Sequence, residues 1–99
     1  MQSKLSKLQK RILLIAFARG GRVTTQAVRL AIFGAQRNLR VEQTQASVIA
    51  RSATRLVGRG LLRRPMPGLV ILTPNGVLYA TRFATEYQQS EKENENATV

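Results

Sequence analysis

The chain contains no cysteine, histidine, aspartate or tryptophan. The absence of cysteine excludes disulfides and thiolate nucleophiles, and the absence of histidine and aspartate excludes most metal sites and the usual catalytic triads. Glu, Ser, Thr, Tyr and Lys are the side chains left for acid–base or nucleophilic chemistry. We therefore predict that the protein is not an enzyme and that it uses no metal and no cofactor.

Acidic residues are few as well. The 99 residues include 16 Lys and Arg against 5 Asp and Glu, for a formal net charge of +11. Residues 1–85 hold fifteen of the basic residues and a single acid, Glu42, whereas residues 86–99 hold one Lys and four Glu. The positive charges of residues 1–85 repel one another, and such an excess is typical of proteins that bind a polyanion. Twelve of the basic residues are Arg, whose planar guanidinium suits phosphates and guanine edges, so we predict a nucleic-acid partner.

No hydrophobic run in the sequence is long enough to cross a membrane. The run at residues 12–18 follows basic residues, as in a signal peptide, but Arg19 comes after it instead of a small-residue cleavage site. The length and the 43% apolar content suit one small domain with one core. We expect a soluble, cytoplasmic protein associated with the nucleoid.

Two helices are predicted in the first third of the chain. Ser6 begins the first one with a capping box, apolar residues then recur at helical spacing, and two glycines at residues 20–21 end it. Residues 22–24 are short and β-branched and predict a minimal strand. Thr24 or Thr25 then begins the second helix. We expect three aromatic residues in the core: Phe17, Phe33 and Phe83.

A third helix is predicted from Thr44, as its cap, to about Arg59, after a polar connection at residues 35–43. Small and apolar residues at spacings of three and four form its predicted buried face: Ala46, Ile49, Ala53 and Leu56. The exposed side is Gln45, Ser47, Val48, Arg51, Ser52 and Arg55. An ordinary solvent-exposed helix mixes Glu with Arg at i, i+4, so the lack of acid on this side indicates a surface that faces a polyanion.

A hairpin and a fourth helix follow. Residues 61–64 and 69–72 predict two strands, joined by the rigid loop Pro65–Gly68. Thr73 followed by Pro74 is a strong helix start, and the helix is predicted to end near residue 88.

The predicted domain covers residues 1–87 and is mainly α with a small antiparallel β wing. Its elements follow the order α-(β)-α-α-β-β-α, which is the order of a winged helix-turn-helix. Residues 88–99 are polar and acidic and have almost nothing to bury, so we predict a disordered tail.

Two motifs in the second half of the chain carry a family resemblance. One is Arg55-Leu56-x-x-x-Gly60-Leu61-Leu62-x-Arg64, and the other is Leu72-Thr73-x-x-Gly76 at the start of the last helix. Together with the opening Leu5–Gln9, they make the stretch from Leu5 to Phe83 similar to the MarR-type winged helix-turn-helix transcription regulators.

The resemblance implies a homodimer that lays its third helix into the major groove of double-stranded DNA and sets its hairpin against the backbone or minor groove. The helix at residues 74–88 would make the dimer contact. Carried over by position, the DNA-binding residues would be Thr44, Gln45, Ser47, Val48, Arg51, Ser52 and Arg55 on the helix, with Arg63 and Arg64 at the wing. Independently, an Arg fork reads guanine and Gln reads adenine. We therefore expect a sequence-specific transcriptional regulator.

The chain departs from the family pattern at its ends and in its hairpin. Typical members have extra terminal helices that build the dimer and enclose a ligand pocket, and this chain has no room for that pocket. We therefore expect no small-molecule ligand. Typical hairpins are longer and have an arginine at the tip, whereas the loop at residues 65–68 is uncharged.

Three alternatives stay open at this point. The charge also suits an RNA-binding or ribosome-associated winged helix, and it suits an architectural protein that coats DNA without sequence preference. A winged-helix module that contacts protein is the third. Aromatic residues make up 5% of the chain, so recognition of single strands by base stacking is poorly supported.

Overall fold

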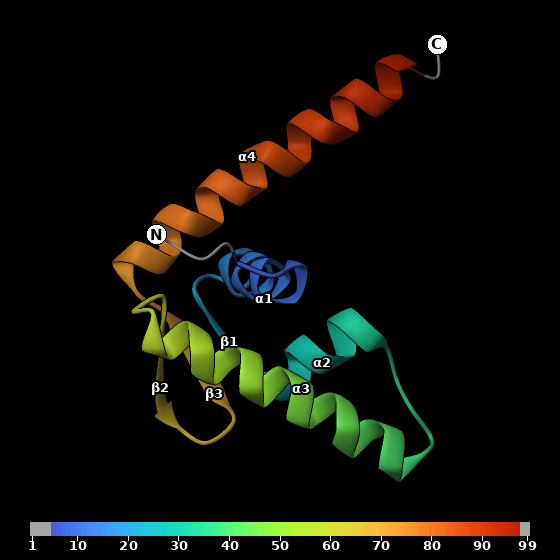
Figure 1. Cartoon of the computed structure of the whole chain (residues 1–99), viewed down its shortest axis with the longest axis vertical. Coiled ribbons are helices and arrows are strands. Elements are labelled where there is room, and N and C mark those ends of the chain that lie inside the picture. The colour runs from blue at the N-terminus through green and yellow to red at the C-terminus, as the bar shows by residue number, and fades with distance from the viewer. Residues whose placement is uncertain (1–4, 98–99) are drawn as a thin grey trace.

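The computed structural model describes the backbone of residues 5–97 and the side chains of residues 5–85. Within these residues the protein is mainly helical and has a small three-stranded antiparallel sheet (Figure 1). The elements are α1 (Lys7–Ala18), β1 (Arg22–Thr24), α2 (Thr25–Phe33), α3 (Leu39–Gly58), β2 (Leu62–Met66), β3 (Leu69–Leu72) and α4 (Pro74–Ala97). Their order is the one that the sequence predicts.

The starts of α1 and α2 confirm the predicted capping residues. The Ser6 hydroxyl accepts a hydrogen bond from the Gln9 N–H at 3.2 Å, and Gln9 Oε1 accepts one from the Ser6 N–H at 2.9 Å. This reciprocal pair is a complete capping box. At α2 the cap is Thr24 and not Thr25, because Thr24 Oγ1 accepts from the Ala27 N–H at 3.1 Å.

Helix α3 begins earlier than the sequence predicts. Its cap is Asn38, whose Oδ1 accepts hydrogen bonds from the N–H groups of Arg40 at 2.9 Å and Val41 at 3.4 Å. Thr44 lies inside the helix, where its hydroxyl donates to the Arg40 carbonyl at 3.0 Å, so the predicted Thr44 cap is wrong. Glu42 in the first turn also favours the earlier start, because a carboxylate stabilises the positive end of the helix dipole.

Strand β3 lies between β1 and β2 and pairs with both in antiparallel fashion. Val70 and Leu72 are buried on the inner face of β3, and Leu69 and Ile71 are half-buried on the outer face. Because side chains alternate along a strand, the inner face belongs to the core and the outer face to the surface.

Strand β2 continues to Met66, so the turn of the hairpin is shorter than the predicted loop at residues 65–68. Pro65 has no N–H to donate to a ladder, but β2 is an edge strand and its pairing is irregular between Arg63 and Met66. Gly68 closes the turn with a positive φ of 83°, which a glycine adopts without strain.

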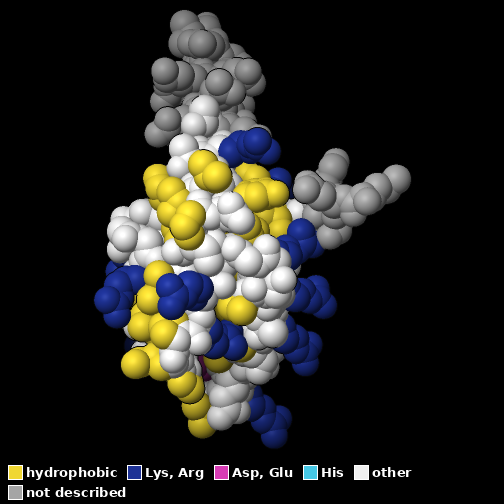
Figure 2. Space-filling model, turned by 90° about the vertical axis from the view of Figure 1, so that its left-hand side faces the viewer, with side chains coloured by type: hydrophobic (Ala, Val, Ile, Leu, Met, Phe, Trp, Pro, Cys, Tyr) yellow, Lys and Arg dark blue, Asp and Glu magenta, His cyan; other side chains and the backbone are white. Residues whose placement is uncertain are grey.

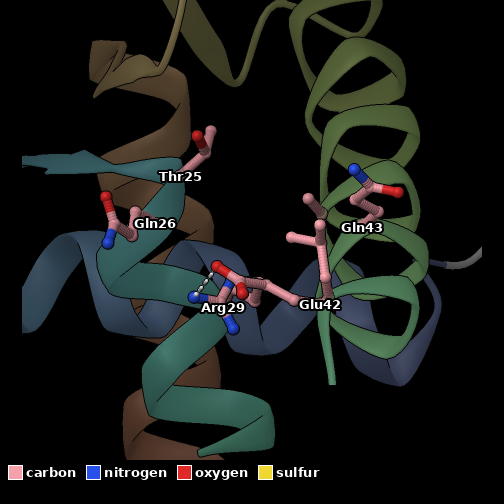
Figure 3. Close-up of a pocket in the computed structure, with 7 residues that line it drawn as sticks. Thr25, Gln26, Arg29, Glu42 and Gln43 are labelled. Carbon is pink, nitrogen blue, oxygen red and sulfur yellow. Dashed lines mark hydrogen bonds and ion pairs between the residues drawn. The ribbon is translucent and has the colours of Figure 1, made fainter. Parts of the chain in front are cut away.

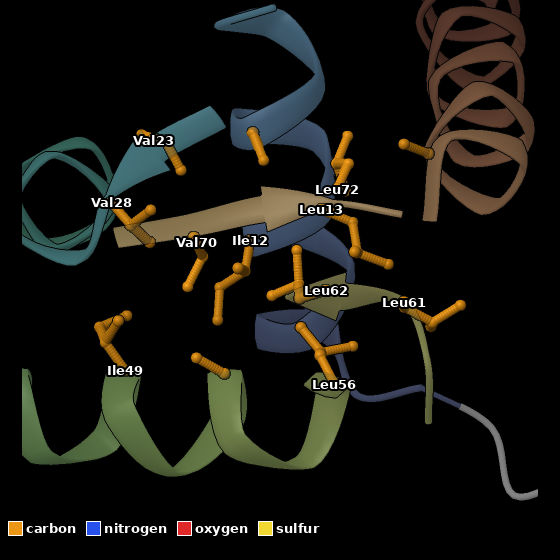
Figure 4. Close-up of a cluster of buried hydrophobic side chains, with 13 residues drawn as sticks. Ile12, Leu13, Val23, Val28, Ile49, Leu56, Leu61, Leu62, Val70 and Leu72 are labelled. Carbon is orange, nitrogen blue, oxygen red and sulfur yellow. The ribbon is translucent and has the colours of Figure 1, made fainter. Parts of the chain in front are cut away.

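The core lies between α1, α3 and the inner face of the sheet (Figure 4). Its largest fully buried side chains are Ile12, Leu13, Val28, Ile49, Leu56, Leu62 and Val70. The prediction that Phe17 and Phe33 belong to the core is wrong, because they are 40% and 38% exposed. Each directly follows a residue that packs into the core, Ala16 or Ile32, and the next position on a helix is rotated by about 100°. Phe83 is half-buried and packs against the core.

The start of α4 is packed closely against the residues that follow α3. The Thr73 hydroxyl donates to the Gly60 carbonyl and accepts from the Gly76 N–H at 3.0 Å, and the Thr73 N–H donates to the Leu61 carbonyl at 3.1 Å. A Cβ on Gly76 would lie 2.0 Å from the Leu61 carbonyl oxygen. The Leu-Thr-x-x-Gly motif is therefore a packing motif as well as a helix start.

Helix α4 continues to Ala97 and extends beyond the body of the protein (Figure 1). The sequence predicts a disordered tail from residue 88, but the backbone of residues 88–97 is helical, and residues 98–99 lie outside the described residues. Glu, Gln, Lys and Ala make up most of this segment and are good helix formers. None of the helices in the described part of the chain is both long and apolar enough to cross a membrane.

Candidate nucleic-acid interface

The face of α3 that points away from the core carries basic and hydroxyl side chains. The buried residues of the helix are Ile49, Ala53 and Leu56, which places positions around Arg51 on the opposite side. Four of the predicted site residues lie there and are exposed: Thr44, Ser47, Arg51 and Arg55. At 1.5 Å per residue they extend over about 16 Å of the helix.

The early start of α3 adds Arg40 to this face, although the sequence predicts a loop at this position. Arg40 is exposed and lies one turn before Thr44. Asn38 was the signal in the sequence that could have predicted this earlier start, because Asn is among the best N-cap residues. Glu42 in the first turn supports the same start. We call Arg40, Thr44, Ser47, Arg51 and Arg55 the outward face of α3, and none of them is acidic.

Two predicted site residues lie on a flank of α3 instead. Gln45 and Ser52 are half-buried, and Gln45 Oε1 is buried with no hydrogen-bond partner among the described residues. Gln45 lies one turn before the buried Ile49, which puts it at the edge of the core stripe. Val48, by contrast, is exposed and lies beside the outward face, one turn after Thr44. Ala46, which the sequence predicts to be buried, is exposed on the other flank. The structure therefore separates Gln45 and Ser52 from the outward face.

The two arginines predicted at the wing point to opposite faces of the sheet. The Arg64 guanidinium donates to Thr54 Oγ1 and to the Ala50 carbonyl oxygen, each at 3.3 Å, so it lies against α3. Arg63 is exposed and is paired with Ile71 on the outer face. Arg64 thus links β2 to α3, whereas Arg63 is open to solvent.

The turn of the hairpin lies against the start of α2. The Thr25 N–H donates to the Gly68 carbonyl at 2.9 Å, and Thr25 Oγ1 lies within van der Waals distance of the Cβ position at Gly68. No charged residue is present from Pro65 to Gly68, where Met66 is exposed. The turn of the hairpin is therefore packed on α2 and has no basic tip.

Arg22 is a basic residue of the sheet that the sequence pattern did not single out. It pairs with Ile71 from β1, and Arg63 pairs with Ile71 from β2, so the two arginines flank one isoleucine on the outer face. Neighbouring strands are about 4.8 Å apart, which places the two Cα atoms about 10 Å apart. The alternation of side chains along β1 could have predicted the exposed position of Arg22, because its neighbour Val23 is buried on the opposite face.

A pocket of about 250 Å³ lies between α2 and α3, next to the outward face. Its lining comes from the first halves of the two helices: Thr25, Gln26, Arg29, Leu39, Glu42, Gln43 and Ala46 (Figure 3). The Arg29 side chain is 6% exposed, and its Nη2 donates to Glu42 Oε1 at 3.3 Å. The other terminal nitrogen, Nη1, is buried with no hydrogen-bond partner among the described residues. No local pattern joins two residues that are 13 positions apart, so the sequence did not reveal this pair.

Basic side chains far outnumber acidic ones on the surface of the described residues. Figure 2 shows the side of the protein that carries β2 and the start of α4, with Lys and Arg side chains over the face and in a column along its right-hand edge. Almost no acidic side chain is visible there, and the single acid of residues 1–85, Glu42, is paired with Arg29. No three potential metal ligands come together in the described part of the chain. The surface formed by residues 5–85 therefore attracts anions without a competing acidic patch.

Comparisons of the chain with protein-family models, with curated proteins and with solved structures found no match. The similarity to MarR-type regulators rests on the sequence motifs and stays a prediction.

Proposed function

We propose that this protein is a winged-helix protein that binds double-stranded DNA in a sequence-specific way, with α3 in the major groove. The observation that carries the proposal is the outward face of α3, which presents three arginines and two hydroxyl side chains, while the single acid of this 20-residue helix, Glu42, is paired with Arg29 away from that face. A major groove about 12 Å wide admits such a helix.

The residues of the outward face suit two kinds of contact. Arg51 and Arg55 can donate two parallel hydrogen bonds to guanine O6 and N7, each such contact discriminating against a wrong base by about 1–3 kcal/mol. Thr44 and Ser47 have hydroxyls that both donate and accept. Arg40, near the start of the helix, suits a backbone phosphate, which positions the protein without reading sequence.

The proposal includes a homodimer that forms through α4. This helix extends beyond the body (Figure 1), and Val77 and Leu78 near its start are 39% and 69% exposed. Two copies of α3 would then occupy half-sites about 34 Å apart, one turn of DNA. Sedimentation at tens of micromolar protein, with and without duplex, checks this part, and a monomer under both conditions would contradict it.

By its resemblance to MarR-type proteins we assign the chain a role as a transcriptional regulator. Such a role places it with the nucleoid in the cytoplasm, and it requires no cofactor and no small-molecule ligand. The same resemblance leaves the direction of regulation open.

In vitro selection from random duplex DNA, repeated at two salt concentrations, tests the proposal. We expect an enriched sequence with approximate two-fold symmetry and an affinity that falls steeply with salt, because phosphate contacts release counterions. A steep salt dependence without any enriched sequence would instead indicate an architectural protein.

Competition between duplex DNA and structured RNA at matched salt separates DNA from RNA as the partner. The major groove of A-form RNA is too narrow for side chains to read, so a helix with outward arginines favours DNA. Displacement of the DNA by a modest excess of RNA would favour the ribosome-associated or RNA-binding alternative.

A further inference from the structure

The buried guanidinium of Arg29 lacks hydrogen-bond acceptors. Its Nη2 donates one hydrogen bond to Glu42 Oε1 at 3.3 Å. This distance is longer than the roughly 2.7–2.9 Å that is usual for a charge-assisted hydrogen bond. Its Nη1 is buried and has no partner among the described residues. Because an unpaired buried donor is unfavourable, this nitrogen favours a further oxygen atom in the pocket.

The surroundings of Nη1 favour an anion as the source of that oxygen. Thr25 and Gln26 are the first residues of α2 and Leu39 is the first residue of α3, so the positive ends of two helix dipoles lie at the pocket. The exposed amides of Gln26 and Gln43 add neutral donors at its rim. The Glu42 carboxylate on Arg29 shows that the site already accepts one anionic group.

We propose that the pocket between α2 and α3 is a phosphate-binding subsite, in which Arg29 Nη1 donates to an oxygen of one phosphate group and Gln26 and Gln43 contact it from the rim. We take the phosphate group to come from the backbone of bound DNA. The pocket residue Gln43 lies one helical turn before Ser47, which belongs to the outward face of α3, so DNA bound to that face would pass close to the pocket. In naming this source, the inference rests on the proposed function. A free phosphate group is the other source.

Glu42 then competes with the phosphate for Arg29. In the free protein its carboxylate neutralises the buried guanidinium, and its side chain is 39% exposed, so it has room to turn toward solvent. When a phosphate occupies Nη1, the two negative charges repel each other. Removal of the charge on Glu42 therefore strengthens phosphate binding at this site.

Three variants of the full-length chain test the subsite on duplex DNA. We expect Glu42→Gln to bind the duplex about five- to tenfold more tightly than the unsubstituted protein. In that background, Arg29→Met removes the contact without leaving an unpaired carboxylate, and it should reverse the gain. It should also reduce the slope of log K against log salt by about 0.9, the contribution of one phosphate. The matched control, Arg19→Met in the same background, removes an equal charge from an exposed residue at the end of α1 and should leave the slope unchanged.

A titration with inorganic phosphate tests the pocket without DNA and without the Arg29 variant. At constant ionic strength, phosphate should shift the backbone amide NMR signals of Thr25, Gln26, Leu39 and Gln43 in Glu42→Gln in a saturable way, whereas chloride should not. Shifts together with the change in slope support the backbone as the source. Shifts with equal slopes support the pocket and assign it to free phosphate.

The absence of both effects would overturn the subsite and leave Arg29–Glu42 as a structural pair. The two proposals fail separately. If the unsubstituted protein binds no duplex, the proposed function is wrong and the phosphate titration alone decides the pocket. If duplex binding depends on Arg51 and Arg55, but neither the Arg29 variant changes the slope nor phosphate shifts the pocket signals, only the subsite is wrong.

Discussion

Helix α3 and the β2–β3 hairpin both carry exposed arginines, but the fold gives these arginines different surroundings. Arg51 and Arg55 lie on the outward face of α3, and their guanidinium groups have no hydrogen-bond or ion-pair partner in the described part of the chain. Arg64 of the hairpin is held on α3 by two hydrogen bonds, and the hairpin turn is held on α2 through Gly68. The comparison shows that exposure alone does not mark a ligand contact. A guanidinium that the fold leaves without acceptors is the better candidate.

The largest expected effect comes from Arg51→Ala combined with Arg55→Ala. If α3 reads DNA, the double variant loses about 2–6 kcal/mol of binding free energy, since each bidentate contact is worth about 1–3 kcal/mol. Fluorescence anisotropy with the selected duplex measures the loss. Arg11→Ala with Arg19→Ala removes the same charge from exposed residues at α1, and an equal loss in this control would show that α3 has no special role.

Gly76→Ala tests the packing beside the hairpin, where the start of α4 contacts Leu61 just before β2. The new Cβ would meet the Leu61 carbonyl oxygen at 2.0 Å, so we expect the free energy of unfolding to fall by about 3 kcal/mol. Gly58→Ala is the control on α3, because that glycine has nothing within 4 Å of its Cβ position and no positive φ. It should raise stability by about 0.5–1 kcal/mol. Urea unfolding measures both, and equal effects would contradict the close packing at Gly76.

The start of α3 gives a third test. Asn38→Ala removes the side chain that caps the helix and should cost about 1 kcal/mol of stability. Thr44→Ala should cost less than about 0.5 kcal/mol, because Thr44 lies inside the helix and is exposed. A larger cost at Thr44 than at Asn38, measured by thermal unfolding, would restore the shorter helix that the sequence predicts.

The smallest expected effect separates Arg63 from Arg64. Arg64→Ala should lower stability by about 0.5 kcal/mol, since its two hydrogen bonds to α3 are exposed to solvent. Arg63→Ala should leave stability unchanged within the error of a denaturant titration. If Arg63→Ala is the more destabilising variant, the alternation of these side chains along β2 is wrong.

Much of the fold was predictable because its boundaries depend on local chemistry. Ser6, Thr24 and Thr73 each accept a hydrogen bond from an N–H three residues ahead, and this interaction needs no distant partner. The alternation of buried and exposed residues in β3 follows from the strand itself in the same way. Four of the predicted helix contacts lie on the outward face for this reason, since helical periodicity alone places them there.

The errors occur where two local signals compete or where a distant segment decides. Asn38 and Thr44 are both good N-cap residues, and the structure uses Asn38. This choice places Glu42 in the first turn of α3, where it forms an ion pair with Arg29 of α2. That choice brings Arg40 into the candidate site. Gln45 looks exposed in the sequence, but it borders the stripe through which α3 packs on the core.

The sequence by itself determined the basic body, the order of elements, the caps of α1, α2 and α4, and the outward positions of Arg51 and Arg55, because these follow from composition and from contacts within a few residues. Only the tertiary structure decided that Arg64 contacts α3, that Gly76 meets the Leu61 carbonyl, and that Arg29 lies buried beside Glu42 with one nitrogen unpaired. These contacts join residues from different elements, and their energies depend on distances that arise only when the elements pack together.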